Sequence, residues 1–133
     1  MKNSPLKFCN ETIHSGERVS LPLPLPESFS YSPMYMPIKV IRGKEKRPSL
    51  LILATMRANQ LNGTEIINRL LDYTILKRLQ GTLITIPVMN VYGLINRSHY
   101  LLGGIELDSN FPGSKTGSYA ARLTDLFYKR NTR

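Results

Sequence analysis

The sequence is poor in cysteine, histidine and long apolar runs. Its only cysteine, Cys9, excludes an internal disulfide and favours a reducing compartment. No stretch approaches the roughly 20 apolar residues of a membrane span, and the N-terminus lacks the apolar core of a signal peptide. We therefore expect a soluble, cytoplasmic protein without a membrane partner.

Acidic residues are also scarce, with 9 Asp and Glu against 18 Lys and Arg and a formal charge of +9. Such an excess can indicate a nucleic-acid or anionic-surface partner. The basic residues are scattered, however, apart from an expected solvated turn and the end of the last expected helix. The turn holds Arg42, Lys44, Lys46 and Arg47, and the chain end holds Lys129, Arg130 and Arg133. Because no aromatic stripe or recognition helix accompanies them, nucleic-acid binding is only a secondary alternative.

What is present indicates an α/β fold with a mixed sheet. Alternating Leu and Pro within residues 17–29 are typical of an edge strand or polyproline segment, and residues 36–43 of a half-exposed strand. The apolar runs at 49–55 and 82–88 predict strands buried on both faces. An antiparallel N-terminal hairpin is thus expected to join parallel strands.

A helix is expected between the two apolar runs. Asn62 and Glu65 have capping-box spacing, and the apolar row through Ile67 and Leu71 continues to Ile75 and Leu79, with the end at Gly81. Strand, helix and strand predict a right-handed parallel crossover.

The remainder of the chain is expected to be a polar loop over 89–115 and a second amphipathic helix over 116–130. Gly113, Ser114 and Gly117 before that helix fit a turn and cap better than an anion site. A chain that stops after this helix lacks the next parallel strand. Either it is a fragment or decayed product, or self-association or a completing chain covers the open sheet edge.

Several words of the sequence, in order, resemble the succinylglutamate desuccinylase/aspartoacylase family of zinc-dependent deacylases. These words are "GER", "LPLP", "MPIKVIRG", "LNGTEIINRLL", "GTLITIPVMNVYGLINRSHYL" and "FPGSKTGSYAARL". The resemblance implies a partial zinc-carboxypeptidase-like (phosphorylase/hydrolase-like) fold, with a tail at 1–15 and a truncated N-terminal part of the catalytic domain at 16–133. It also implies zinc-dependent hydrolysis of acyl groups from a small N-acylated amino acid.

The family's zinc ligands are replaced in this chain. The family's loop reads His-Gly-Asp-Glu or His-Gly-Asn-Glu, and alignment on "LNG" puts Arg57 at the His position and Gln60 at the Glu position. A guanidinium has no lone pair to donate, and an amide lacks the carboxylate charge. The family's third ligand and its general-base Glu lie beyond residue 133. No metal site is therefore expected to be intact, and no cofactor is expected in this chain.

The substrate positions are altered as well. The family's Asp-Leu-Asn-Arg segment, whose Asn and Arg hold the substrate carboxylate, becomes Glu106, Leu107, Asp108 and Ser109. His99 stands where relatives commonly have Arg. An Asp repels a carboxylate and a Ser cannot form a bidentate clamp, so we expect no intact catalytic residue and a non-catalytic member.

Two further hypotheses concern the same region. The first is an active zinc hydrolase completed by another chain or by the His99 loop with Glu106 and Asp108. The second is local: Arg57 pairs with Glu65 or Asp108 and forms a salt bridge where relatives hold zinc.

Overall fold

The computed structural model describes residues 5–25, 33–45, 48–97 and 106–131, with side chains described up to Asp125. The strands are β1 (Leu6–Phe8), β2 (Glu11–Ile13), β3 (Arg18–Pro24), β4 (Tyr35–Arg42), β5 (Ser49–Leu53) and β6 (Thr82–Ile86). The helices are α1 (Leu61–Leu71), α2 (Val91–Asn96) and α3 (Tyr119–Asn131), with 3-10 turns η1 (Thr74–Arg78) and η2 (Asp108–Asn110). Among the helices of these described ranges, none is long and apolar enough to cross a membrane.

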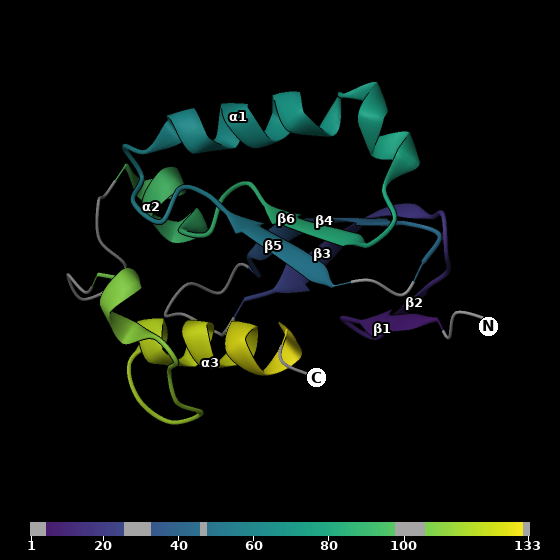
Figure 1. The fold of residues 1–133 in the computed structure, drawn as a ribbon. Helices are drawn as coiled ribbons and strands as arrows, with labels where there is room; N and C mark the ends of the chain where they lie inside the picture. The colour runs from purple at the N-terminus through teal and green to yellow at the C-terminus, as the bar shows by residue number, and fades with distance from the viewer. Residues whose placement is uncertain (1–4, 26–32, 46–47, 98–105, 132–133) are drawn as a thin grey trace.

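A mixed four-stranded sheet organises the chain, in the order β3-β4-β6-β5. β3 pairs antiparallel with β4, β4 pairs antiparallel with β6, and β5 pairs parallel with β6. Helix α1 crosses one face of the sheet and α3 lies along the other (Figure 1). The predicted α/β class, antiparallel hairpin and parallel crossover are therefore confirmed.

The two apolar runs have different places in the sheet. β6 is buried at all five residues, because strands flank it on both sides. β5 lies at an edge, none of its five residues is buried, and the side chain of Leu50 is 59% exposed. The prediction that residues 49–55 are buried on both faces was wrong, because an apolar run does not reveal a strand's lateral position.

Two apolar clusters, one on each face, pack the sheet against its helices. The larger joins β1–β4 and β6 to α3, through residues that include Met36, Ile38, Ile86, Ala120 and Leu123. The smaller joins α1 to the other face through Ile41, Ile67, Leu71 and Leu83. Burial of these side chains at about 25 cal/mol per Å² is the main force that fixes both helices on the sheet.

The first helix differs from its prediction at both ends. Gln60 occupies the N-cap without a side-chain hydrogen bond, so Asn62 lies inside the first turn and no capping box forms. The helix ends at Leu71, and the residues that follow turn into η1, where Ile75 is 70% exposed. The apolar row beyond Leu71 was therefore not a continuation of the helix face.

The N-terminal residues pack against the domain. β1 and β2 form a hairpin, and Phe8 and Ile13 are buried in the larger cluster. Arg42, expected in a solvated turn, is only 6% exposed and donates from Nη1 to the carbonyl oxygen of Ile13 at 2.8 Å. The described part of the expected 1–15 tail is thus packed against the core, whereas the domain boundary itself stays a prediction.

Candidate functional site

The loop between β5 and α1 is held by hydroxyl groups. Thr55, which is 3% exposed and has a φ of 55°, bonds through Oγ1 to the Gln60 carbonyl oxygen at 3.1 Å and to Thr64 Oγ1 at 2.6 Å. Thr64 Oγ1 also lies 2.7 Å from the Pro87 carbonyl oxygen, so the two hydroxyl protons are shared among three contacts. These bonds satisfy buried polar groups at the strand end and fix the path of residues 55–60.

The same loop is tied to the segment that follows β6. Asn90 N donates to the Thr55 carbonyl oxygen at 2.9 Å, and Met89 N to the Ala54 carbonyl oxygen at 2.9 Å. The Asn90 side chain is 1% exposed and caps α2 by accepting from Gly93 N at 2.8 Å. The two strand-end loops therefore form one hydrogen-bonded unit.

Close packing at the start of α1 requires the glycine of "LNG". A Cβ on Gly63 would lie 2.9 Å from the Cβ of Ala54, closer than such atoms approach in real structures. Gly63 therefore lets the first turn of α1 rest on the end of β5, which places Arg57 in the loop beside them.

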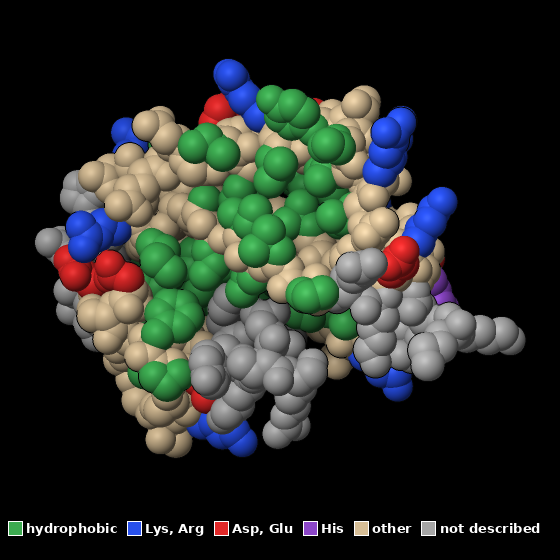
Figure 2. Space-filling view, in the orientation of Figure 1, with side chains coloured by type: hydrophobic (Ala, Val, Ile, Leu, Met, Phe, Trp, Pro, Cys, Tyr) green, Lys and Arg blue, Asp and Glu red, His purple; other side chains and the backbone are tan. Residues whose placement is uncertain are grey.

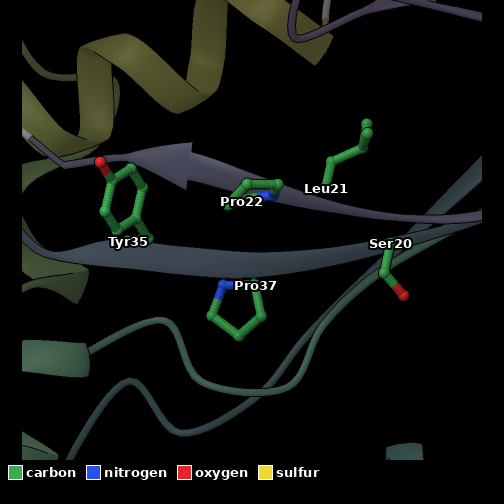
Figure 3. Close-up of a pocket in the computed structure, with 5 residues that line it drawn as sticks. All are labelled: Ser20, Leu21, Pro22, Tyr35 and Pro37. Atoms are coloured by element: carbon green, nitrogen blue, oxygen red, sulfur yellow. The ribbon is translucent and has the colours of Figure 1, made fainter.

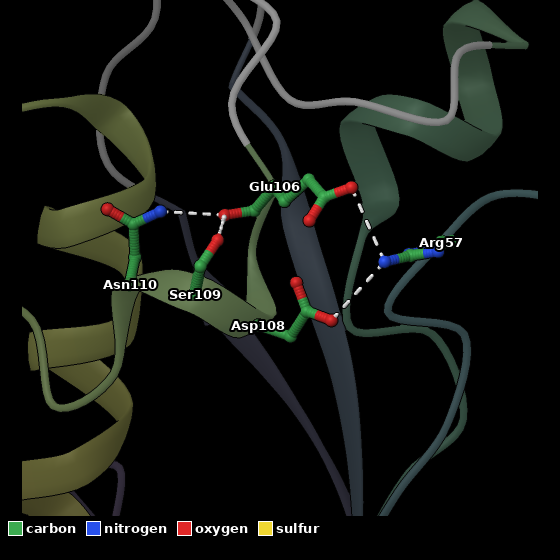
Figure 4. A network of polar contacts seen from close by, with 5 residues as sticks. All are labelled: Arg57, Glu106, Asp108, Ser109 and Asn110. Carbon is green, nitrogen blue, oxygen red and sulfur yellow. Dashed lines mark hydrogen bonds and ion pairs between the residues drawn. The ribbon is translucent and has the colours of Figure 1, made fainter.

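Arg57 lies between two carboxylates (Figure 4). Its Nη2 is 3.3 Å from Glu106 Oε1 and 3.6 Å from Asp108 Oδ2. All three side chains are a little under half exposed, so the charges are partly screened by water. The predicted pairing with Asp108 is confirmed. The pairing with Glu65 was wrong, because Glu65 binds Arg69 one helical turn away at 2.9 Å.

The acidic side of the site is anchored to the core. Leu107 is 2% exposed, between the two acidic residues. Asn110 Nδ2 donates to the Glu106 carbonyl oxygen at 2.6 Å, and Ser109 Oγ to the same oxygen at 3.3 Å. Thr124 of α3 donates to the Asn110 carbonyl oxygen at 2.9 Å. The loop 106–110 therefore presents its carboxylates from a braced backbone.

The residues that the resemblance aligns with the family's site are only partly brought together. Asp108 contacts Arg57, whereas Ser109 is turned to the backbone of Glu106. Gln60 is exposed at the start of α1, and its backbone oxygen serves Thr55. His99 lies outside the described residues, so the rival site with Glu106 and Asp108 stays a prediction.

The residues that the resemblance aligns with zinc ligands do not fit a zinc ion. A guanidinium at Arg57 carries a positive charge and donors only, and it already engages the two nearest carboxylates. Within the described ranges, no group of three or more His, Cys, Asp or Glu side chains is placed to hold a metal. We derive no metal-dependent step for this arrangement.

A hollow on β3 and β4 lacks groups suited to catalysis or metal binding. Its lining is Ser20, Leu21, Pro22, Tyr35 and Pro37, on β3 and β4, and its volume is about 300 Å³ (Figure 3). No charged side chain lines it. The Arg57 site is therefore the better candidate for a functional position.

Sequence reasoning missed three members of the site. Glu106 was not foreseen as a partner of Arg57, and Thr55 and Asn90 were not foreseen as its support. Asn90 could have been recognised, because Asn is a preferred N-cap residue, and in the structure its side chain accepts from Gly93 N three residues later. The short helix α2 was instead included in the expected loop 89–115.

The chain shares its mixed α/β fold with several solved structures. More particularly, the chain is similar in structure to aspartoacylase and succinylglutamate desuccinylase proteins. An aspartoacylase family protein from Mesorhizobium loti superposes with a TM-score of 0.73 at 22% identity, over 86% of this chain and 37% of that one. A succinylglutamate desuccinylase/aspartoacylase from Rhodobacter sphaeroides gives a TM-score of 0.72 at 19% identity, over 83% and 34%.

A third similar structure contains a bound product. It is the ectoine utilization protein EutE (DoeB) from Ruegeria pomeroyi, with a TM-score of 0.69 at 22% identity, over 83% of this chain and 35% of that one. The chain thus spans a little over a third of the length of these structures. No protein-family model and no curated protein matches the sequence.

Proposed function

We propose that this chain is a metal-free, non-catalytic relative of the zinc-dependent deacylases that remove acyl groups from N-acylated amino acids. One observation carries the proposal: the Arg57 guanidinium lies where the resemblance puts a zinc-binding His, in ion contact with Glu106 and Asp108. The ion pair thus takes the place of the metal centre and links the β5–α1 loop to the 106–110 loop.

The charges around Arg57 argue against metal binding. Zinc is bound by imidazole nitrogen, thiolate or carboxylate, each of which presents a lone pair. A cation at this point would meet the fixed positive charge of Arg57, which stays protonated at any ordinary pH. The carboxylates of Glu106 and Asp108 are already partly neutralised by Arg57, so they attract a second cation weakly.

The same charges disfavour the substrate. A small N-acylated amino acid carries a carboxylate, which needs a free cationic or amide clamp. Arg57 is the cation nearest to the two acidic residues, and they hold it. Asp108 adds a negative charge at the position where the resemblance expects an amide. Asp108 therefore repels the substrate carboxylate at the position where the resemblance expects a group that binds it.

The first experiment measures zinc by elemental analysis in the purified full chain, before and after dialysis against a mild chelator. We expect no retained zinc and no hydrolysis of N-acyl amino acids with or without added zinc. About one zinc per chain after dialysis would overturn the proposal and favour the alternative of a working hydrolase.

A pair of variants sharpens this test. Arg57→His restores the family's residue at one position, yet we expect it to retain no zinc. Gln60 still lacks a charge, and the nearby Glu106 and Asp108 carboxylates are nearly half exposed and so remain hydrated. Arg69→His supplies a matched histidine on the exposed face of α1, away from the loop. Zinc retained by the Arg57 variant alone would refute the idea that the whole site is degenerate.

We also propose that the outer edge of β5 is a contact surface. Within the described residues, no strand pairs with that edge, and unpaired edges of this kind invite pairing with another chain. The partner is either a second copy or a completing chain. Light scattering tests the first possibility, and a monodisperse, stable monomer would count against self-association.

A further inference from the structure

An apolar groove lies beside the start of β5. It has a volume of about 520 Å³ and is lined by Pro48, Leu50, Ile75, Leu76, Arg78, Leu79, Gln80, Gly81, Thr82 and Leu83. Leu50 is 59% exposed and Ile75 is 70% exposed. Figure 2 shows hydrophobic side chains gathered on this face, over β5 and below α1. A contiguous exposed apolar surface often marks an interaction site, whereas single exposed apolar residues need no explanation.

The backbone of β5 offers hydrogen bonds next to the groove. Ala54 N, just after β5, donates to Ile86 O, so the N–H and C=O groups of Ala54 face β6. Since the peptide groups of a strand alternate in direction, those of Leu51 and Leu53 face the open side. The opposite edge of the sheet, β3, carries Pro22 and Pro24, which limit pairing there. Among the described residues, the sheet is therefore protected at one edge and unpaired at the other.

Positive charge flanks the groove. Arg78 of η1 lines the groove, and a second hollow of about 430 Å³, which shares Ile75 and Arg78 with it, is also lined by Thr74 and Lys77. Within the described part of the chain, neither cation makes an ion pair. The whole chain has a formal charge of +9, so a second copy would bring like charge to this surface. An acidic occupant is favoured over self-association.

We propose that β5 and the groove bind an extended segment of another protein, apolar at alternate positions and acidic at one end. Its backbone adds a strand to the open edge of β5, as in β-strand addition. Alternate apolar side chains then cover Leu50 and Ile75, and the acidic end overlies Lys77 and Arg78. The inference rests on the proposed contact surface at β5 and specifies the chemistry of its partner. It does not depend on the Arg57 ion pair, which lies past the other end of β5.

The test is fluorescence anisotropy of the full chain with a labelled peptide that alternates valine and threonine and ends in a run of glutamates. Two control peptides are matched: one replaces the glutamates with lysines, and one replaces alternate threonines with prolines. We expect binding to the first peptide alone, weakened by salt. Equal binding of the lysine or proline peptide would overturn the charge or the strand part of the proposal.

Protein variants distinguish binding in the groove from non-specific binding to the protein surface. Ile75→Lys is expected to weaken peptide binding about tenfold, because it removes apolar contact area and places a charge under it. Ile66→Lys is the matched control, since Ile66 is 65% exposed on α1 and does not line the groove. Lys77→Glu with Arg78→Glu is expected to weaken binding by at least about fivefold.

The remaining outcomes decide between partners. Equal loss in the Ile66 and Ile75 variants would refute the groove. A dimer in light scattering that Ile75→Lys abolishes would assign the surface to a second copy and refute the acidic partner. Zinc content measured on the same samples keeps the two proposals apart, because zinc-free protein that ignores the peptide refutes only this inference.

Discussion

Removal of Arg57 tests the ion pair directly. In Arg57→Ala, Glu106 and Asp108 lose their shared counter-ion and face each other. Since their oxygens lie 3.3 Å and 3.6 Å from one nitrogen, they are at most 6.9 Å apart (3.3 + 3.6). Two negative charges at about 7 Å repel by about 0.6 kcal/mol in water and somewhat more near a protein surface.

That repulsion is present in both proteins, so the stability lost in the variant is the attraction of Arg57 for the two carboxylates. Each contact is nearly half exposed, so each contributes only about 0.2–1 kcal/mol. We therefore expect Arg57→Ala to lower the free energy of unfolding by about 0.5–2 kcal/mol at low salt, or about 2–8 °C in Tm. The measurement is urea or thermal unfolding followed by circular dichroism, repeated at high salt, where the loss should shrink as screening weakens the charges.

A matched variant and a double-mutant cycle complete this experiment. Arg69→Ala removes an exposed pair one helical turn apart, with side chains 76% and 61% exposed, and should cost only about 0.3–0.5 kcal/mol. In Arg57→Ala with Asp108→Asn, relief of the repulsion should recover part of the loss. If Arg57→Ala costs no more than Arg69→Ala and ignores salt, the ion pair does not brace the site.

Three further predictions concern the support of the site and the core. Gly63→Ala should lose about 1 kcal/mol of stability in denaturant unfolding, because overpacking against Ala54 outweighs the gain in helix propensity, and adding Ala54→Gly should restore it. Asn90→Ala should lose about 1–3 kcal/mol, because it leaves the buried amide of Gly93 without an acceptor, and unchanged unfolding would contradict the capping role. Burial raises the pKa of Tyr119 above its ordinary value of 10.0, with Arg122 opposing the shift, so the folded protein keeps a proton that the unfolded chain releases above pH 10. Stability should therefore fall as pH rises above 10 and fall less in Tyr119→Phe, and parallel pH profiles for the two proteins would refute this.

The strand pattern was predictable where local chemistry decides it. Proline cannot donate to a neighbouring strand, so Leu-Pro alternation identified β3 as an edge strand. The position of β5 was not predictable in the same way, because an apolar run does not report how many strands flank it, and at this edge none of its five residues is buried. The end of α1 was missed because the apolar residues of η1 continue the helical spacing while the backbone leaves the helix.

The site was predictable to the extent that the resemblance placed its two loops together. The Arg57–Asp108 contact follows from such a placement and from opposite charge. The choice of Glu106 over Glu65 does not, because it depends on Arg69, which binds Glu65 within the helix. The bond from Thr64 to Pro87 likewise joins residues distant in sequence, and no spacing rule reports it.

The central place of β6 has a consequence for synthesis on the ribosome. Both of its neighbours, β4 and β5, precede it in the chain, so neither half of the sheet can join the other until residue 86 has been made. Before then, the nascent chain can form the β3–β4 hairpin but leaves the apolar residues of β5 and α1 without their cover. Chaperone contacts and misfolding should therefore concentrate in the interval before β6 emerges.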